Sequence, residues 1–551
     1  MKSEITDIIK ALCEKQFGID IQANIDRPEK QFGDFSTNVA MQLAPRLKKS
    51  PLDIAKDLVK ELNNLNKFSK VELVAPGFIN ITLKNADILS ILNQELTWPK
   101  VHAGKQVLVE YGDPNAFKEM HLGHVYSSIV GDVISSLLKS SGADVKSLIY
   151  QGDVGLNIAK GIYGIGEHIN WDISLLDTVT KEKSIGYFYA EGERAYQNNP
   201  AASERIKLIN NSVYTKNDEQ INYIYDFGKK MSFDQFDKIF NEIGVSFDKR
   251  YVESQSAVIG KNLVEQNIGK VFEKSQGAII YRGEQDGLYT AVFITSQGLP
   301  TYQAKDLGLT QLKSKDFPEA DKSIIITANE QDDNFKVVFA ALAKIDPELA
   351  RRTIHISHGF LTLTTGKMSS RTGDVYTGAE LINSIKQAIE EQYPDSNVKK
   401  DIFMAALRYT FIKQRIGANI VFNPKESVTI EGNSGPYIQY AHARAKNILA
   451  KLSNLDSVSL DHDYILDVDE RNLVSLMSQF TEVVEQSINE YMPHHICTFL
   501  YQLAQEFNSF YERNRVIGDP RQDLRVRIVN RYVRILKTGL DLLHIPAPDY
   551  M

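Results

Sequence analysis

Cysteine is scarce in this sequence of 551 residues, which contains only two, Cys13 and Cys497. Two cysteines cannot build a disulfide framework, and they cannot supply a cysteine-based zinc site. So low a count is typical of a protein that works in a reducing compartment. We therefore expect a cytoplasmic protein without a structural metal.

Long hydrophobic runs are also missing. The first residues, Met1–Ile9, have the pattern of an acidic-capped helix and lack the apolar segment of a signal peptide. No run elsewhere in the sequence is long enough to span a bilayer. We therefore expect a soluble protein without a membrane partner.

A general excess of positive charge is missing as well, because the formal net charge is −7. This argues against a protein whose whole surface grips nucleic acid, since phosphate neutralisation supplies most non-specific affinity. Basic residues nevertheless dominate one stretch near the C-terminus, which contains Arg513, Arg515, Arg521, Arg525, Arg527, Arg531, Arg534 and Lys537. This stretch fits either a nucleic-acid contact or a solvated helix face.

The chain is long enough for several domains, and its pattern changes twice. Residues 1–98 predict a small α+β unit that ends near Trp98-Pro99-Lys100, since proline ends regular structure. Strands alternate with helices over 101–390, which predicts an α/β domain with a doubly wound parallel sheet and a long insertion at 160–290. From 391 to 551 the pattern is almost wholly helical, which predicts a helical bundle.

The central motif of the sequence lies at a strand-to-helix turn. The apolar run Val107–Val109 predicts a strand, and an amphipathic helix follows soon after it. Such a turn points the unpaired amides of the helix into the crevice beyond the sheet, where a phosphate chain binds well. His121 and His124 share a face there and can each donate to a phosphate oxygen, while Gly123 lets a ribose or base approach the backbone. The pair also fits half of a zinc site, or two histidines that cap or pack the helix.

A second motif, residues 366–373, lies far downstream between glycines. Glycine permits a mobile loop, and Lys367 carries a compact charge on a flexible stem that can follow a triphosphate. Ser369 and Ser370 can donate hydrogen bonds beside it. By itself the segment fits a basic surface loop equally well.

A third motif fits a guanidinium group. Tyr302 and Asp306 lie four residues apart on a helix that Thr301 caps, so they face the same way. They offer a hydroxyl and a carboxylate, which suit the planar fork of donors on a guanidinium, although such a pair on a helix usually just faces solvent. Ile324–Ile326 then predicts a buried parallel strand, and Gln331 follows it at the edge where ligands bind in such sheets.

The first two motifs together resemble the HIGH and KMSKS motifs of class I aminoacyl-tRNA synthetases, in the same order. The form P-N-x-x-K-x-x-H-x-G-H resembles the arginyl-tRNA synthetase version, and it consists here of Pro114, Asn115, Lys118, His121, Gly123 and His124. Segments 32–40 and 75–80 resemble the additional N-terminal domain of that family, and Gly435–Arg444 resembles the start of its anticodon-binding bundle. The sequence is therefore identified as a member of the arginyl-tRNA synthetases.

The resemblance implies an arginine–tRNA ligase. Such an enzyme activates L-arginine with ATP and Mg²⁺ to arginyl-adenylate, and it then transfers arginine to the 3′-terminal ribose of tRNA(Arg). The family also implies that tRNA binds before the adenylate forms. We expect a monomer.

The resemblance also implies roles for individual residues. Those that would carry catalysis are His121, His124, Lys118 and Lys367. Those that would bind ATP are Pro114, Gly123, Met368, Ser369 and Ser370. Those that would bind arginine are Asn115, Tyr302, Asp306 and Gln331. The tRNA contacts that we expect are made by Tyr437, Gln439, Arg527, Arg531 and Arg534.

Three positions depart from the pattern of the family. Val154 replaces the usual tryptophan of G-D-W-G, Asn334 replaces the histidine of E-Q-x-x-H-F, and Ser370 replaces the second lysine of KMSKS. Two other functions also fit the nucleotide motif: a small nucleotidyltransferase, which lacks the flanking domains, and a non-catalytic tRNA-binding relative. Cysteinyl and glutaminyl synthetases share the core, but the first would need zinc-ligating cysteines and the second has no need of an anionic pocket.

Overall fold

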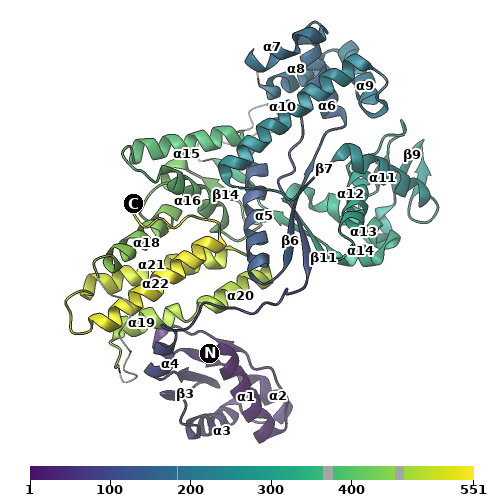
Figure 1. The fold of residues 1–551 in the computed structure, drawn as a ribbon. Helices are drawn as coiled ribbons and strands as arrows, with labels where there is room; N and C mark the ends of the chain where they lie inside the picture. The colour runs from purple at the N-terminus through teal and green to yellow at the C-terminus, as the bar shows by residue number, and fades with distance from the viewer. Residues whose placement is uncertain (183, 364–375, 453–463) are drawn as a thin grey trace.

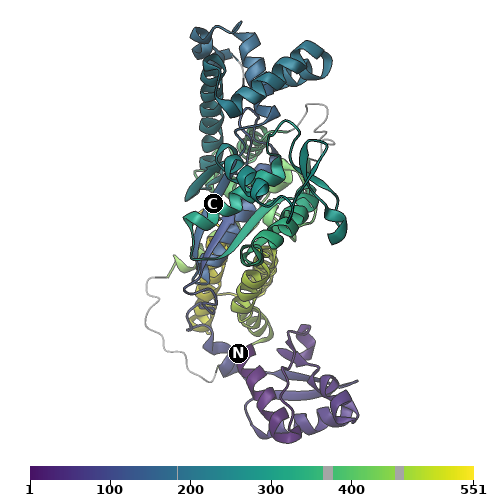
Figure 2. The ribbon, with the colours of Figure 1, turned by 90° about the vertical axis from the view of Figure 1, so that its right-hand side faces the viewer.

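The computed structural model of the chain describes residues 1–182, 184–363, 376–452 and 464–551. The molecule is elongated, as Figure 1 and Figure 2 show from two sides. A small N-terminal domain lies at one end, a helical insertion lies at the other, and a sheet and a helical bundle lie between them. None of the described helices is long and apolar enough to cross a membrane.

A five-stranded parallel sheet with the order β12-β11-β5-β6-β7 forms the centre. Its strands are β5 (Gln106–Glu110), β6 (Asp144–Gln151), β7 (Lys249–Val252), β11 (Ala320–Ala328) and β12 (Thr353–His358). The first of these strands in the sequence, β5, lies in the middle, and the later strands are added first on one side and then on the other. This confirms the predicted doubly wound fold, and it places a ligand crevice at the carboxyl ends of β5 and β11, where the strand order reverses.

Helix α5 (Leu122–Ser140) connects β5 to β6 and is buried along almost its full length. Because the helix packs on all sides inside the protein, its N-terminus is held firmly against the carboxyl edge of the sheet. The other helices around the sheet are α11 (Glu253–Gln266), α12 (Tyr302–Asp316), α13 (Asp332–Ile345) and α14 (Pro347–Arg352).

The insertion consists of two parts separated by the edge strand β7. The first part is helical and has a hydrophobic core of its own. Its helices are α6 (Leu156–His168), α7 (Leu176–Glu182), α8 (Ile185–Asn198), α9 (Pro200–Thr215) and α10 (Glu219–Ile243). The second part adds a small antiparallel sheet of β8 (Glu273–Ser275), β9 (Ala278–Tyr281) and β10 (Ala291–Ile294).

The N-terminal domain is the small α+β unit that the sequence predicts. Its antiparallel sheet, in the order β1-β2-β4-β3, contains β1 (Ile25–Asp26), β2 (Phe35–Thr37), β3 (Lys70–Val74) and β4 (Phe78–Thr82). Its helices are α1 (Lys2–Phe17), α2 (Val39–Leu47), α3 (Pro51–Asn64) and α4 (Asn85–Ser90).

The C-terminal part is helical, as predicted. Its helices are α15 (Gly378–Gln392), α16 (Lys399–Ile412), α17 (Pro424–Ser427), α18 (Gly435–Leu449), α19 (Val468–Met477), α20 (Phe480–Glu490), α21 (His494–Arg513) and α22 (Gln522–Leu542). A short parallel pair, β13 (Leu361–Leu363) and β14 (Ile420–Phe422), joins this part to the catalytic domain.

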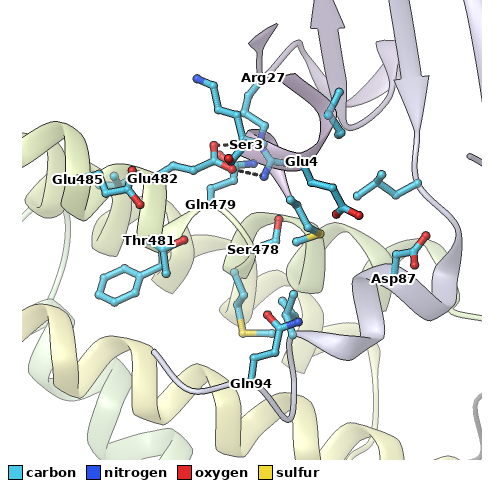
Figure 3. Close-up of a pocket in the computed structure, with 18 of the residues that line it drawn as sticks. Ser3, Glu4, Arg27, Asp87, Gln94, Ser478, Gln479, Thr481, Glu482 and Glu485 are labelled. Atoms are coloured by element: carbon cyan, nitrogen blue, oxygen red, sulfur yellow. Dashed lines mark hydrogen bonds and ion pairs between the residues drawn. The ribbon is translucent and has the colours of Figure 1, made fainter. Parts of the chain in front are cut away.

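Three ion pairs join the N-terminal domain to the bundle, and one of them places Lys30 Nζ 2.7 Å from Glu506 Oε2. An Arg27 Nη2 atom lies 2.7 Å from Glu482 Oε1, and an Arg471 Nη2 atom lies 2.6 Å from Asp34 Oδ2. Figure 3 shows Arg27 beside Glu482 at the wall of a cavity of about 1080 Å³ between the two domains. The N-terminal domain is therefore attached to the bundle through charged contacts around a wide, polar gap.

Candidate functional site

A pocket of about 370 Å³ lies at the carboxyl edge of the parallel sheet. Residues from the ends of β5, β6, β11 and β12 and from the first turns of α5, α11, α12 and α13 line it. Eight residues selected from the sequence line this one pocket: Asn115, Lys118, His121, Gly123, His124, Tyr302, Asp306 and Gln331. Pro114 is not among its lining residues. The predicted ATP contacts Lys367, Met368, Ser369 and Ser370 lie outside the described residues.

The two histidines begin helix α5 and orient each other. The His121 Nδ1 atom accepts a hydrogen bond from the Gly123 amide at 3.1 Å, and His124 Nδ1 accepts one from the His121 amide at 3.3 Å. Their rings are stacked, with centroids 3.7 Å apart. A neutral imidazole that accepts at Nδ1 carries its proton at Nε2, so each ring keeps one N–H donor. The histidines do cap the helix, and this capping leaves their Nε2 donors available for a ligand.

Burial keeps both imidazoles neutral. It lowers the pKa of His121 to about 4, and the charge of Lys118 lowers it further. The pKa of His124 is also lowered by burial and by its neighbour His121. Gly123 is needed between them, because a Cβ atom there would lie 3.0 Å from His121 Cε1. This end of the pocket therefore offers neutral hydrogen-bond donors at the N-terminus of a helix.

Lys118 places a cation beside the histidines. Its ammonium group lies 4.6 Å from the centre of the Tyr189 ring, which belongs to α8 of the insertion. Burial lowers the pKa of Lys118, and the charge of Lys160 acts in the same direction. The insertion thus contacts the lysine that lines this end of the pocket.

The other end of the pocket is acidic. Five carboxylates line the pocket, and two of them form ion pairs. Glu110 lies 2.8 Å from Lys313, and Glu253 lies 2.5 Å from Lys305, in two buried ion pairs. Asp306 instead accepts a hydrogen bond from Asn334 Nδ2 at 3.1 Å, and no described lysine or arginine forms an ion pair with it. Burial, together with the charges of Glu110 and Glu253, raises the pKa of Asp306 to about 7. Asp306 therefore gains strongly from a cationic ligand, which would favour its ionised form.

Tyr302 and Asn115 flank this acidic end. The Tyr302 hydroxyl accepts a hydrogen bond from Asn157 Nδ2 at 3.3 Å, and 54% of the residue is exposed. The Asn115 side chain packs directly on Gly152, where a Cβ atom would lie 2.0 Å from Asn115 Oδ1. Gln331 comes just before α13 and is exposed at the rim. These side chains leave hydroxyl and amide groups facing the pocket around Asp306.

Several residues of the pocket were missed in the sequence. They are Glu110, Asp113, Tyr150, Glu253 and His358. Most of them end a parallel strand or follow it directly, so the rule that ligands bind at the carboxyl ends of such strands would have found them. Val154, by contrast, lies in the hydrophobic core of the insertion with Ala116 and Phe117, where an apolar residue fits well.

Two of the five residues predicted to contact tRNA are buried inside the protein. Gln439 is fully buried, and its amide donates to the backbone carbonyls of Asp401 and Pro546 at 3.0 and 2.8 Å. Arg531 is 4% exposed and donates to the Gln94 carbonyl. Side chains held inside the protein in this way cannot reach a tRNA phosphate. These two residues hold the bundle, the chain end and the N-terminal domain together, so we do not retain them as tRNA contacts.

Three of the predicted tRNA residues keep more exposure. The Tyr437 hydroxyl accepts from Asn508 at 2.9 Å, Arg527 donates to Asn93 at 3.1 Å, and Arg534 is exposed. The basic stretch is also less free than its sequence suggests, because Arg521 and Arg525 both form ion pairs with the buried Glu470.

A second cavity of about 670 Å³ lies on the bundle at the end of α21. Its lining combines aromatic, basic and amide side chains, among them Lys451, Tyr511, Arg513, Asn514 and Arg515. Such a combination suits a nucleobase that stacks on a ring while its phosphate meets an arginine.

Comparisons with known proteins match the whole architecture. Residues 87–422 match the family model described as tRNA synthetases class I (R), catalytic domain. Residues 1–83 match the arginyl tRNA synthetase N terminal domain, and residues 438–551 match the DALR anticodon binding domain.

Individual relatives and solved structures agree with these models. The chain is 27% identical to an arginine–tRNA ligase of Parabacteroides distasonis, with 100% of both chains covered. It is 29% identical to one of Borrelia garinii subsp. bavariensis, over 99% of this chain and 98% of the relative. The structure of Thermus thermophilus arginyl-tRNA synthetase superposes with a TM-score of 0.80 at 25% identity, with 100% of both chains covered.

Proposed function

Because this chain belongs to the arginyl-tRNA synthetase family of class I, we propose that its pocket activates L-arginine with ATP and charges tRNA(Arg). In the first step an oxygen of the arginine carboxylate attacks the α-phosphate of ATP. The bond from the α-phosphorus to the pyrophosphate oxygen breaks, which leaves arginyl-adenylate and pyrophosphate. In the second step a hydroxyl of the terminal ribose, the 2′-hydroxyl in a class I enzyme, attacks the arginyl carbonyl and releases AMP.

One observation carries this proposal: a single pocket joins neutral donors at a helix N-terminus to a carboxylate that has no cationic partner among the described residues. The substrate supplies its own nucleophile, so the protein needs only to align the reactants and stabilise the phosphate charge. This requirement explains how the reaction proceeds without a nucleophilic side chain of the protein.

We assign the phosphate end of the pocket to ATP. The Nε2 donors of His121 and His124 would bind phosphate oxygens as charge develops on them, and Gly123 would admit the nucleoside. Lys118 would add a positive charge beside the departing pyrophosphate. Mg²⁺ arrives as part of the ATP substrate. Lys367 keeps the catalytic role that the family resemblance implies, and Pro114, Met368, Ser369 and Ser370 keep the ATP-binding role.

We assign the acidic end to arginine. Asp306 would pair with the guanidinium, because a neighbouring cation stabilises the ionised form of the carboxylate, which burial disfavours. Tyr302, which lies one helical turn before Asp306, would contact the same group. Asn115 and Gln331 would bind the part of the arginine substrate that lies close to its reacting carboxylate.

We place the tRNA on the bundle. The half-buried Arg527 and the exposed Arg534, with Tyr437, would contact its backbone. The cavity lined by Tyr511, Arg513 and Arg515 would receive an unstacked base. We further propose a monomer of the cytoplasm, and the low cysteine count favours that compartment.

The test is arginine-dependent exchange of labelled pyrophosphate into ATP, run with and without tRNA(Arg). Lysine, glutamine and cysteine serve as control amino acids, because related synthetases would use the last two. Exchange with arginine alone among these amino acids, and only in the presence of tRNA, is the expected result. No exchange with any amino acid would support a non-catalytic tRNA-binding protein.

A further inference from the structure

Asn334 lies in the first turn of α13 and lines the acidic end of the pocket. Its Nδ2 atom donates a hydrogen bond to Asp306 Oδ2 at 3.1 Å, which fixes the orientation of the amide. Its Oδ1 atom is then the remaining polar group. This oxygen is buried and has no hydrogen-bond partner among the described residues.

A buried acceptor without a donor is unfavourable, and such atoms in native proteins usually serve a purpose. Here the atom lies beside the Asp306 carboxylate, in a pocket where Glu110 and Glu253 already have lysine partners. Two neighbouring acceptors, one charged and one neutral, require a ligand with at least two donors. A guanidinium has five N–H donors and no acceptor, so it satisfies both.

We infer that Asn334 is a specificity-determining residue for arginine: its Nδ2 holds the Asp306 carboxylate, and its Oδ1 accepts an N–H of the substrate guanidinium. This inference rests on the proposed function and assigns a role to the position at which the family motif has a histidine. Citrulline would present a carbonyl oxygen to one of these acceptors and would be repelled. The single ammonium of lysine would not span both of them.

The Asn334 hydrogen bond also tunes the charge of Asp306. Asp306 faces Glu110 from β5, Glu253 from α11, Asp113 from the turn after β5, and Tyr150 from β6, and on its own helix it has Lys305 and Tyr302 as neighbours. Burial and the charges of Glu110 and Glu253 raise the pKa of Asp306, whereas the Asn334 amide and Lys305 lower it. A side chain that cannot donate would therefore move the ionisation of Asp306, and with it arginine binding, to higher pH.

The experiment measures binding of L-arginine, L-citrulline and ATP to the full-length protein by calorimetry, between pH 6 and pH 9. The variants are Asn334→Leu, Asn334→Asp and Asn334→His. Asp333→Asn is the matched control, because its side chain is 78% exposed, pairs with Lys336 and does not line the pocket.

We expect Asn334→Leu to weaken arginine binding at pH 7 by roughly 10- to 100-fold, the usual effect of losing hydrogen bonds to charged groups. Part of this loss should be recovered at pH 9, while ATP binding stays within twofold of the wild type. Asn334→Asp keeps the shape of the side chain but repels Asp306, so its arginine binding should also weaken at pH 7 and recover at high pH. Asn334→His should restore arginine binding above pH 7, where the imidazole is neutral, and lose it more steeply below.

Two outcomes separate this inference from the proposed function. If the wild type binds arginine and both Asn334→Asp and Asn334→Leu bind it within twofold at every pH, the role of Asn334 is wrong and the proposed function stands. If the wild type binds no arginine, both are wrong. Should Asn334→Leu lose its fold, seen as loss of ATP binding, the isosteric Asn334→Asp decides the question alone.

Discussion

At both ends of the pocket burial favours the neutral form of a titratable side chain, but the side chains are bases at one end and an acid at the other. At the ATP end, burial holds His121 and His124 neutral, with the pKa of His121 near 4. At the arginine end, burial raises the pKa of Asp306 to about 7, so that this group lies close to losing its charge. Each end is therefore arranged to gain from the charge of its own ligand: phosphate at one, guanidinium at the other.

The difference lies in what surrounds each group. Both histidines hydrogen-bond to backbone amides of their own helix, so their orientation is set locally. Asp306 is held by Asn334 from another helix, and its neighbours Glu110 and Glu253 are neutralised by lysines from α12. The ATP end thus depends on one turn of helix, whereas the arginine end depends on tertiary packing. Substitutions at one end should leave ligand binding at the other end unchanged.

Asp306→Asn should produce the largest effect. The substitution removes the charge that a buried guanidinium needs, so we expect kcat/KM for arginine to fall roughly a thousandfold, as when one partner of a buried ion pair is lost. The KM for ATP should stay within about threefold. Pyrophosphate exchange at saturating tRNA measures both values. An equal rise in both KM values would show that the two ends are not independent.

His124→Asn should have the next largest effect, at the opposite end. Loss of one donor to the developing phosphate charge typically costs roughly 100-fold in kcat. Arginine affinity, measured by calorimetry, should be unchanged. His495→Asn is the control, because His495 lies on α21 and pairs with Glu490 outside the pocket. Weakened arginine binding in His124→Asn would show that the two ends of the pocket do not bind their ligands independently.

The pH dependence should separate the two ends as well. Arginine binding needs the ionised Asp306, so KM for arginine should rise about tenfold for each pH unit below 7 and level off above it. The histidines are neutral from pH 5 upward, so KM for ATP should be flat between pH 5 and 8. KM values for both substrates across this range provide the test. A flat arginine profile would mean that Asp306 is not the group that binds the guanidinium.

The sequence was sufficient for the local features of the site. The i, i+3 spacing of His121 and His124 and the i, i+4 spacing of Tyr302 and Asp306 each place two side chains on one helix face. The alternation of strands and helices predicted the parallel sheet, and the strand-to-helix turn predicted where the pocket lies. Both are set by short stretches of chain.

Tertiary contacts set the rest, and periodicity cannot reveal them. Arg531 looked like a surface cation in a basic stretch, but docking of the N-terminal domain brings the Gln94 carbonyl to it. Gln439 looked exposed in a helix start, but the returning chain end places the Pro546 carbonyl against its amide. The lysine partners of Glu110 and Glu253 are likewise remote in sequence, so the isolation of Asp306 was visible only in the fold.

The smallest effect we expect concerns stability. The unfolded chain returns Asp306 to an ordinary pKa near 4, so unfolding releases a proton between about pH 4 and 7 and the folded state loses stability as pH rises through this range. Asp306→Asn removes that cost, and should raise the free energy of unfolding of the catalytic domain by on the order of 1 kcal/mol at pH 8. The gain should nearly disappear at pH 4, where Asp306 is protonated in the folded state and about half protonated in the unfolded chain. Denaturant unfolding at the two pH values measures it, with Asp333→Asn as the exposed control. A gain in stability that is equal at both pH values would come from changed packing. The buried Asp306 carboxylate would then not destabilise the folded protein electrostatically, and this difference between the two ends of the pocket would be lost.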